Sequence, residues 1–99
     1  MPKAVLIGPP GAGKSSVGRQ LAKLWECDIF DSDAEIERIS GKKIADIFTD
    51  DGEPAFRTIE REVVLEALKT APGVVALGGG SVLDPIVNEY LQASSIPVL

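Results

Sequence analysis

A glycine-rich segment near the start of the chain, residues 8–15, does most to restrict the choice of fold. It reads Gly-Pro-Pro-Gly-Ala-Gly-Lys-Ser and matches the phosphate-loop pattern G-x-x-x-x-G-K-[ST] at every fixed position. The apolar run at residues 4–7 precedes it and is typical of a buried strand. Apolar residues at helical spacing follow it: Val17, Leu21, Leu24 and Trp25. A strand, such a loop and a helix, in that order, indicate an α/β domain that binds nucleoside triphosphates.

The backbone of this loop is suited to hold phosphate groups. Glycine permits positive φ angles and close approach, so successive N–H groups can turn toward an anion beside the positive end of the following helix. We expect Lys14 to reach the β- and γ-phosphates and act in catalysis, and the Ser15 hydroxyl to bind Mg²⁺. The predicted ATP-binding residues are Gly11, Ala12, Gly13, Lys14, Ser15 and Ser16. A purely structural glycine turn is the alternative, but such a turn has no need of Lys-Ser at this offset.

Composition narrows the function further. The chain has 99 residues, 44% of them hydrophobic, and we expect one small domain over residues 1–99. The net charge of -5 argues against a nucleic-acid partner. Cys27 is the only cysteine and histidine is absent, which excludes an internal disulfide, Cys/His zinc sites and imidazole catalysis. Because we find no secretory signal pattern and no apolar stretch near the ~20 residues of a membrane span, we expect a cytoplasmic protein without a membrane partner.

Apolar runs and turn residues predict the other elements. Strands are expected at residues 29–30 and 74–77, and a fourth is expected to begin at residue 96. Helices are expected at residues 14–25 and 34–40, from residue 44 to before Gly52, from Glu53-Pro54 to the break at Pro72, and over residues 86–91 after an Asp84-Pro85 cap. Ser32 or Asp33 is expected to cap the helix at residues 34–40. This order predicts a three-layer phosphate-loop NTPase fold, a parallel sheet with helices on both faces.

Two segments that follow expected strands carry the remaining candidate site residues. Asp-Ser-Asp at residues 31–33 follows the second strand, and Gly-Gly-Gly at residues 78–80 follows the third. Ligands of parallel α/β sheets bind at the carboxyl ends of the strands, so the phosphate loop and the two aspartates are expected to open onto the same crevice. The glycines indicate a loop where the backbone comes close to another group. Structural alternatives remain for each: Asp33 as an N-cap, the glycines as a plain turn, and Arg57 as a surface residue paired with Glu60.

Taken together, these motifs resemble the shikimate kinases, phosphate-loop kinases that act on a small metabolite of aromatic amino-acid biosynthesis. The resemblance covers all 99 residues, and its carriers are residues 8–16, Asp-Ser-Asp at 31–33, Phe-Arg-Thr-Ile-Glu at 56–60 and Gly-Gly-Gly at 78–80. It implies transfer of a phosphoryl group from ATP to a hydroxyl of shikimate, with Mg²⁺ as cofactor. A kinase of another small metabolite, such as gluconate, and a non-catalytic nucleotide-binding fragment are the alternatives.

The resemblance also implies roles for single residues. Asp31 would join Ser15 at Mg²⁺ through water, and Asp33 would be catalytic, in contact with the hydroxyl that is phosphorylated. Arg57 would hold the shikimate carboxylate, for which a guanidinium offers two parallel hydrogen bonds. Gly79 would present its backbone to the substrate, supported by its neighbours. The substrate-binding residues implied are therefore Asp33, Arg57, Gly78, Gly79 and Gly80.

Shikimate kinases continue beyond the equivalent of residue 99 into a lid with an ATP-contacting arginine, a further substrate-binding arginine, a last strand and an adenine-binding loop. The resemblance thus implies that this chain is the N-terminal part of such an enzyme, with a sheet incomplete at its C-terminus. We expect the complete enzyme to be a monomer that binds ATP and shikimate. Residues 1–99 alone are expected to associate through an open strand edge and to lack measurable activity.

Overall fold

The computed structural model describes residues 2–8 and 14–98. Within these residues the strands are β1 (Ala4–Gly8), β2 (Ile29–Asp31) and β3 (Val74–Gly78). The helices are α1 (Lys14–Leu24), α2 (Ser32–Ser40), α3 (Ile44–Asp50), α4 (Glu53–Thr70), the short 3₁₀ helix η1 (Gly79–Leu83) and α5 (Pro85–Ala93). No helix in this part of the chain combines the length and the apolar character that a membrane span needs.

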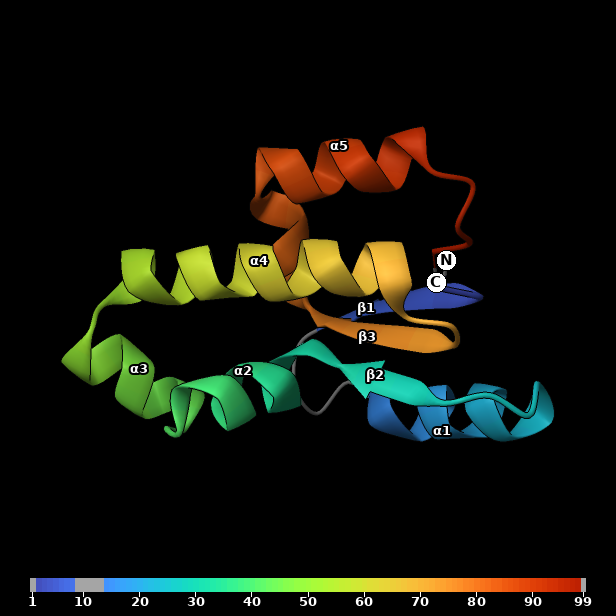
Figure 1. Cartoon of the computed structure of the whole chain (residues 1–99), viewed down its shortest axis with the longest axis horizontal. Coiled ribbons are helices and arrows are strands. Elements are labelled where there is room, and N and C mark those ends of the chain that lie inside the picture. Colours follow the sequence, from blue (N-terminus) through green and yellow to red (C-terminus); the bar gives the residue numbers. More distant parts are fainter. Residues whose placement is uncertain (1, 9–13, 99) are drawn as a thin grey trace.

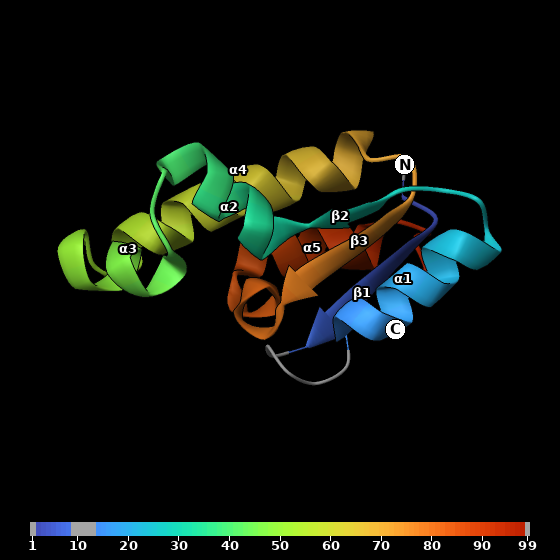
Figure 2. The ribbon, with the colours of Figure 1, turned by 90° about the horizontal axis from the view of Figure 1, so that it is seen from below.

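The strands form a parallel sheet in the order β1-β3-β2, seen side by side in Figure 2. All residues of the central strand β3 are buried, as its unbroken apolar sequence predicts. On the outer side of β1, Val98 forms a parallel bridge with Val5, whose N–H donates to the Pro97 carbonyl at 2.8 Å. This bridge lies where the fourth strand was expected to begin.

Helices cover both faces of the sheet, which confirms the predicted three-layer α/β arrangement. Helices α4 and α5 lie on one face and α1 on the other (Figure 1). The main core, between the sheet and the first pair, includes Val5, Val64, Leu68, Val75, Leu77, Val87 and Leu91. On the opposite face a smaller cluster contains Leu6, Ala22 and Val74. Neighbouring residues of one strand therefore point to opposite layers, as the strand period requires.

Helix α1 contacts the sheet through small residues. Gly18 and Ala22 are buried, whereas Leu24 is 74% exposed and Trp25 lies just beyond the helix at 38% exposed. A Cβ on Gly18 would lie 2.5 Å from Cδ1 of Ile29, so the missing side chain allows the helix to approach β2. Of the apolar residues that marked this helix in the sequence, Leu21 packs against the cluster on this face, whereas Leu24 and Trp25 do not belong to it.

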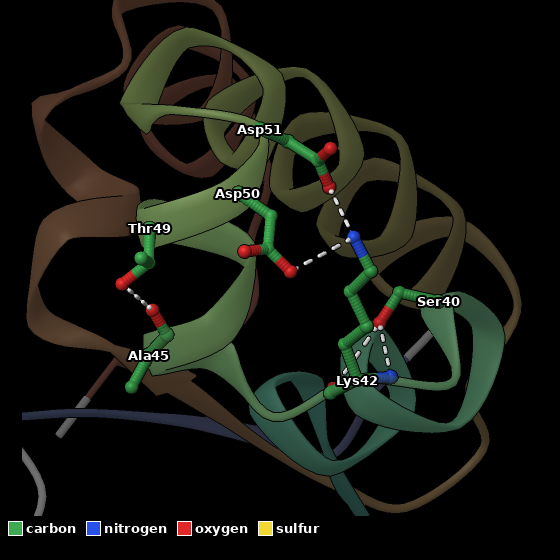
Figure 3. Close-up of polar contacts among 6 residues, drawn as sticks. All are labelled: Ser40, Lys42, Ala45, Thr49, Asp50 and Asp51. Atoms are coloured by element: carbon green, nitrogen blue, oxygen red, sulfur yellow. Dashed lines mark hydrogen bonds and ion pairs between the residues drawn. The ribbon is translucent and has the colours of Figure 1, made fainter.

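Helices α2 and α3 form an arm beyond the carboxyl end of β2 (Figure 1). Its small core joins the arm to α4 through Ile36, Ile47, Phe56 and Val63. Two ion pairs also join the turn between α2 and α3 to the end of α3. Lys42 Nζ lies 3.1 Å from an oxygen of Asp51 and 3.5 Å from one of Asp50 (Figure 3). Gly41 ends α2 in the left-handed conformation that favours glycine at this position.

Candidate active site

The predicted ATP-binding residues lie where β1 leads into α1. Gly11, Ala12 and Gly13 fall outside the described residues, so their role stays a prediction. Helix α1 begins at Lys14 and continues through Ser15 and Ser16. The positive end of this helix therefore follows the loop directly, at the carboxyl edge of the sheet, which is the position that phosphate binding requires.

Asp31 ends β2 and caps α2. Its backbone is extended (φ -109°, ψ 116°), and its Oδ1 accepts hydrogen bonds from the N–H groups of Asp33 at 3.0 Å and Ala34 at 3.3 Å. The expectation that Ser32 or Asp33 caps this helix was wrong, because α2 starts directly at the end of the strand and both residues are already helical. The N-cap role that was the structural alternative for Asp33 therefore belongs to Asp31.

Asp31 is the candidate metal ligand that the structure describes. Both capping bonds use Oδ1, so Oδ2 does not take part in the cap. The described residues contain no group of three or more His, Cys, Asp or Glu side chains that could hold a metal ion. Mg²⁺ keeps several waters and is commonly held by one or two protein oxygens together with phosphates. Asp31 offers one such oxygen, Oδ2, at the carboxyl end of β2.

The carboxylate of Asp33 lies against the end of β3. A Cβ on Gly78 would be 3.3 Å from Oδ1 and 3.5 Å from Oδ2 of this side chain. Gly78 has an ordinary extended backbone (φ -64°, ψ 148°), so close approach, not unusual conformation, explains the glycine. The structure thus brings Asp33 from α2 next to the glycine segment at the carboxyl end of β3.

The guanidinium of Arg57 lies against the other end of the same segment. A Cβ on Gly80 would be 2.5 Å from Nη1 and 3.0 Å from Nη2. Nη1 donates to Oε1 of Glu60 at 2.8 Å, and Nε lies 3.6 Å from an oxygen of Glu53. The hydrogen bond that Arg57 donates to Glu60, aided by the charge of Glu53, raises the pKa of Arg57 above its usual range. Arg57 is therefore always charged, and its side chain stays 38% exposed.

Glu60 is the main site residue whose environment the sequence did not reveal. Its side chain is only 5% exposed, and its partner is Arg57, one turn earlier on α4. The sequence suggested this pair, but as a surface contact. The sequence did contain a sign that Glu60 is buried, because this residue lies four positions after Phe56 on the buried face of α4. A buried carboxylate that pairs with a half-exposed arginine fixes the direction of that arginine.

An ion pair anchors the segment that follows the glycines. Arg61 Nε donates to Oδ2 of Asp84 at 2.6 Å, and Oδ1 of Asp84 accepts from the Ile86 N–H at 2.9 Å as the predicted cap of α5. The first contact ties the end of η1 to α4. Ser32 and Ser81 are fully buried, and their hydroxyls have no hydrogen-bond partner among the described residues. No pattern in the sequence pointed to these two serines.

Comparison with known proteins agrees with this geometry. The family model described as shikimate kinase matches residues 10–99. Among curated relatives, shikimate kinase of Rhodococcus erythropolis is 56% identical over 95 residues, which cover 96% of this chain and 56% of the relative. Shikimate kinase of Thermobifida fusca is 64% identical over 83 residues, covering 84% of this chain and 48% of the relative. The chain thus spans about half the length of the curated relatives it matches.

Solved structures give the same result. Shikimate kinase from Acinetobacter baumannii in complex with shikimate superposes with a TM-score of 0.90 at 42% identity, covering 99% of this chain and 54% of that one. Shikimate kinase from Bacteroides thetaiotaomicron superposes with a TM-score of 0.83 at 30% identity over 90% of this chain. The fold, the spacing of the motifs and these matches agree, and the chain belongs to the shikimate kinase family.

Proposed function

We propose that residues 1–99 carry the ATP and shikimate sites of a shikimate kinase, which transfers the γ-phosphoryl group of ATP to a hydroxyl of shikimate. The observation that carries the proposal is the glycine segment at residues 78–80, which has the Asp33 carboxylate at one end and the Arg57 guanidinium at the other. A carboxylate and a guanidinium at the two ends of a backbone segment without side chains suit a substrate with both a hydroxyl and a carboxylate.

On the acceptor side, each group has a separate role. Asp33 orients the hydroxyl and takes its proton, although phosphoryl transfer depends mostly on positioning and charge neutralisation. Arg57 binds the carboxylate of shikimate, and Glu60 holds its guanidinium in the required direction. Gly79 presents its backbone to the substrate, with Gly78 and Gly80 as supports.

On the nucleotide side, residues 11–13 and Ser16 surround the phosphates with backbone N–H groups, and Lys14 reaches the β- and γ-phosphates. Ser15 and Asp31 are the residues proposed to hold Mg²⁺, which when bound supplies positive charge to the transferred phosphoryl group. Because the proposed reaction consumes ATP, we propose the cytoplasm as its location. The complete enzyme is proposed to act as a monomer, since the two substrate sites are built from one chain.

The test is a coupled assay of ADP release with and without shikimate. Residues 1–99 are assayed alone and joined to the C-terminal part of the Rhodococcus erythropolis relative. We expect shikimate-dependent release from the joined protein, and none above background from residues 1–99, because in phosphate-loop enzymes an added arginine can contribute about 10³–10⁵ in rate. Lys14→Ala should abolish the release without changing the circular dichroism spectrum. A folded joined protein without shikimate-dependent release would contradict the proposal.

Asp33 is tested in the same joined protein. Asp33→Asn should lower kcat far more than it raises the KM for ATP, because the change affects the acceptor side of the reaction. Asparagine fills the space of aspartate but cannot take a proton. Activity equal to that of the parent would show that Asp33 has only a structural role.

A further inference from the structure

A hollow lies at the edge of the sheet, and its lining contains none of the described residues of the candidate active site. It is bounded by Asp28 and the first two residues of β2, by α2 and by the outer side of α4, and its volume is about 650 Å³. We call it the edge groove. None of the described site residues, Asp31, Asp33 and Arg57 among them, lines it. It lies along β2, the strand at the opposite edge of the sheet from the bridge to Val98.

The floor and walls of the edge groove are apolar. Val63, Ala67 and Val74 lie at its base and are buried in the domain. Ile39 of α2 and Ile29 of β2 line its sides and remain 57% and 37% exposed. Grouped apolar surface of this kind favours an occupant that removes it from water.

The rim of the edge groove is negatively charged. Glu62 and Glu66 stand one turn apart on α4, and Asp28 lies at the start of β2. Among the described residues these three carboxylates have no ion-pair partner, whereas the fourth, Glu35, is paired with Arg38. No lysine or arginine is among the described residues that line the groove. Like charges at i and i+4 destabilise a helix, so a bound cation would relieve the repulsion between the two glutamates.

We propose that the edge groove binds a small organic cation with an apolar body, such as an aryl-alkyl ammonium. The apolar part lies on Val63 and Ala67, and the ammonium lies between the carboxylates of Glu62 and Glu66. The volume falls within the range of about 300–1,000 Å³ that small-molecule sites occupy. A second copy of this chain is disfavoured as the occupant, because its net charge of -5 adds to the negative rim.

The test compares three probes of one shape and different charge: phenylbutylammonium, phenylbutanol and phenylbutyrate. Amide NMR spectra of the chain report both the site and the affinity. We expect the cation to shift the amides around Glu62, Glu66 and Thr70, the alcohol to bind about tenfold more weakly, and the anion not to bind. Added salt should weaken only the binding of the cation. Equal binding of all three probes, or shifts confined to other parts of the chain, would overturn the proposal.

Variants test the role of the rim. The double variant Glu62→Gln/Glu66→Gln should weaken binding of the cation about tenfold and leave that of the alcohol unchanged. Glu89→Gln, which alters an exposed glutamate on α5, is the matched control and should change neither. Thr70→Lys places a positive charge in the groove while both glutamates are kept, so it should weaken the binding of the cation. If the folded double variant bound the cation as tightly as the parent, the proposal would be overturned. It would also be overturned if the groove bound a basic amphipathic peptide but not phenylbutylammonium.

Discussion

The glycines at the two ends of β3 are required by different neighbours. Before the strand, a Cβ on Gly73 would overlap the backbone oxygen of Asp28. After it, a Cβ on Gly80 would lie 2.5 Å from Nη1 of Arg57. Backbone within a sheet cannot move aside, whereas the end of a long side chain can. The amino end of β3 is therefore shaped by the packing of the sheet, and the carboxyl end by the side chains of the candidate site.

The hydrogen bonds around Gly73 explain why its neighbour cannot move. The oxygen of Asp28 that a new Cβ would meet already accepts the Val74 N–H at 2.9 Å, which begins the pairing of β2 with β3. The carbonyl of Gly73 itself accepts the Lys3 N–H at 2.8 Å, just before β1. One glycine thus lies where all three strands are tied together.

The largest effect is expected from Gly73→Ala. The new methyl group must displace Asp28 and its hydrogen bond, so the free energy of unfolding should fall by about 2–4 kcal/mol. Urea denaturation followed by circular dichroism measures this. A loss below about 0.5 kcal/mol, the range of an ordinary surface substitution, would show that the start of β2 can move and would remove the contrast between the two ends.

A different outcome is expected from Gly80→Ala, the matched substitution at the other end of β3. Arg57 can swing away from the new methyl group, so the free energy of unfolding should change by less than about 1 kcal/mol. The displaced guanidinium would no longer lie beside the glycine segment, so shikimate should bind more weakly. Calorimetry on the protein joined to the relative's C-terminal part measures the affinity. Destabilisation as large as that of Gly73→Ala would contradict the comparison.

Arg57→Lys separates the charge of this residue from its shape. Lysine keeps the positive charge but lacks the planar fork, so we expect weaker shikimate binding with unchanged ATP binding. The two affinities are measured by calorimetry in the same joined protein. If shikimate bound equally well to parent and variant, Arg57 would serve the helix through Glu60 and not the substrate.

Much of the fold could be predicted because the sequence marks its elements locally. Buried parallel strands need unbroken apolar runs, and β1 and β3 have them. Pro54 and the Asp84-Pro85 pair mark the starts of α4 and α5, and both were placed correctly. The cap of α2 was missed because Asp31, Ser32 and Asp33 are all suitable caps, and only the length of β2 decides among them.

The site could be predicted less fully, because its residues act through contacts between distant segments. The resemblance implied that Asp33, Arg57 and the glycines share one substrate site, and the structure places them together. Which glycine faces which side chain depends on how α2 and α4 pack, and no local pattern gives this. The roles of residues 11–16 stay predictions. The edge groove has no motif at all, because it arises from the spacing between two helices and a strand.

The smallest effect concerns the ion pair that holds the end of η1. Hydrogen bonding from Arg61, aided by the Ile86 N–H, lowers the pKa of Asp84 below its usual range. A lowered pKa in the folded state means that this pair stabilises the fold above the pKa of about 4 that aspartate has in an unfolded chain, and that the contribution is lost as the pH falls further. Asp84→Asn keeps the cap of α5 and removes the charge, so it should cost about 0.2–1 kcal/mol at pH 7, with the difference from the parent shrinking toward pH 3. Urea denaturation of parent, Asp84→Asn, Arg61→Met and the double variant at both pH values forms a complete cycle. Two outcomes would contradict this role of the pair: losses of unfolding free energy that add fully in the double variant, or a difference between parent and Asp84→Asn that does not change with pH. In either case the side-chain pair does not hold the carboxyl end of β3. The contrast with the amino end, which backbone hydrogen bonds hold, would then depend on the glycines alone.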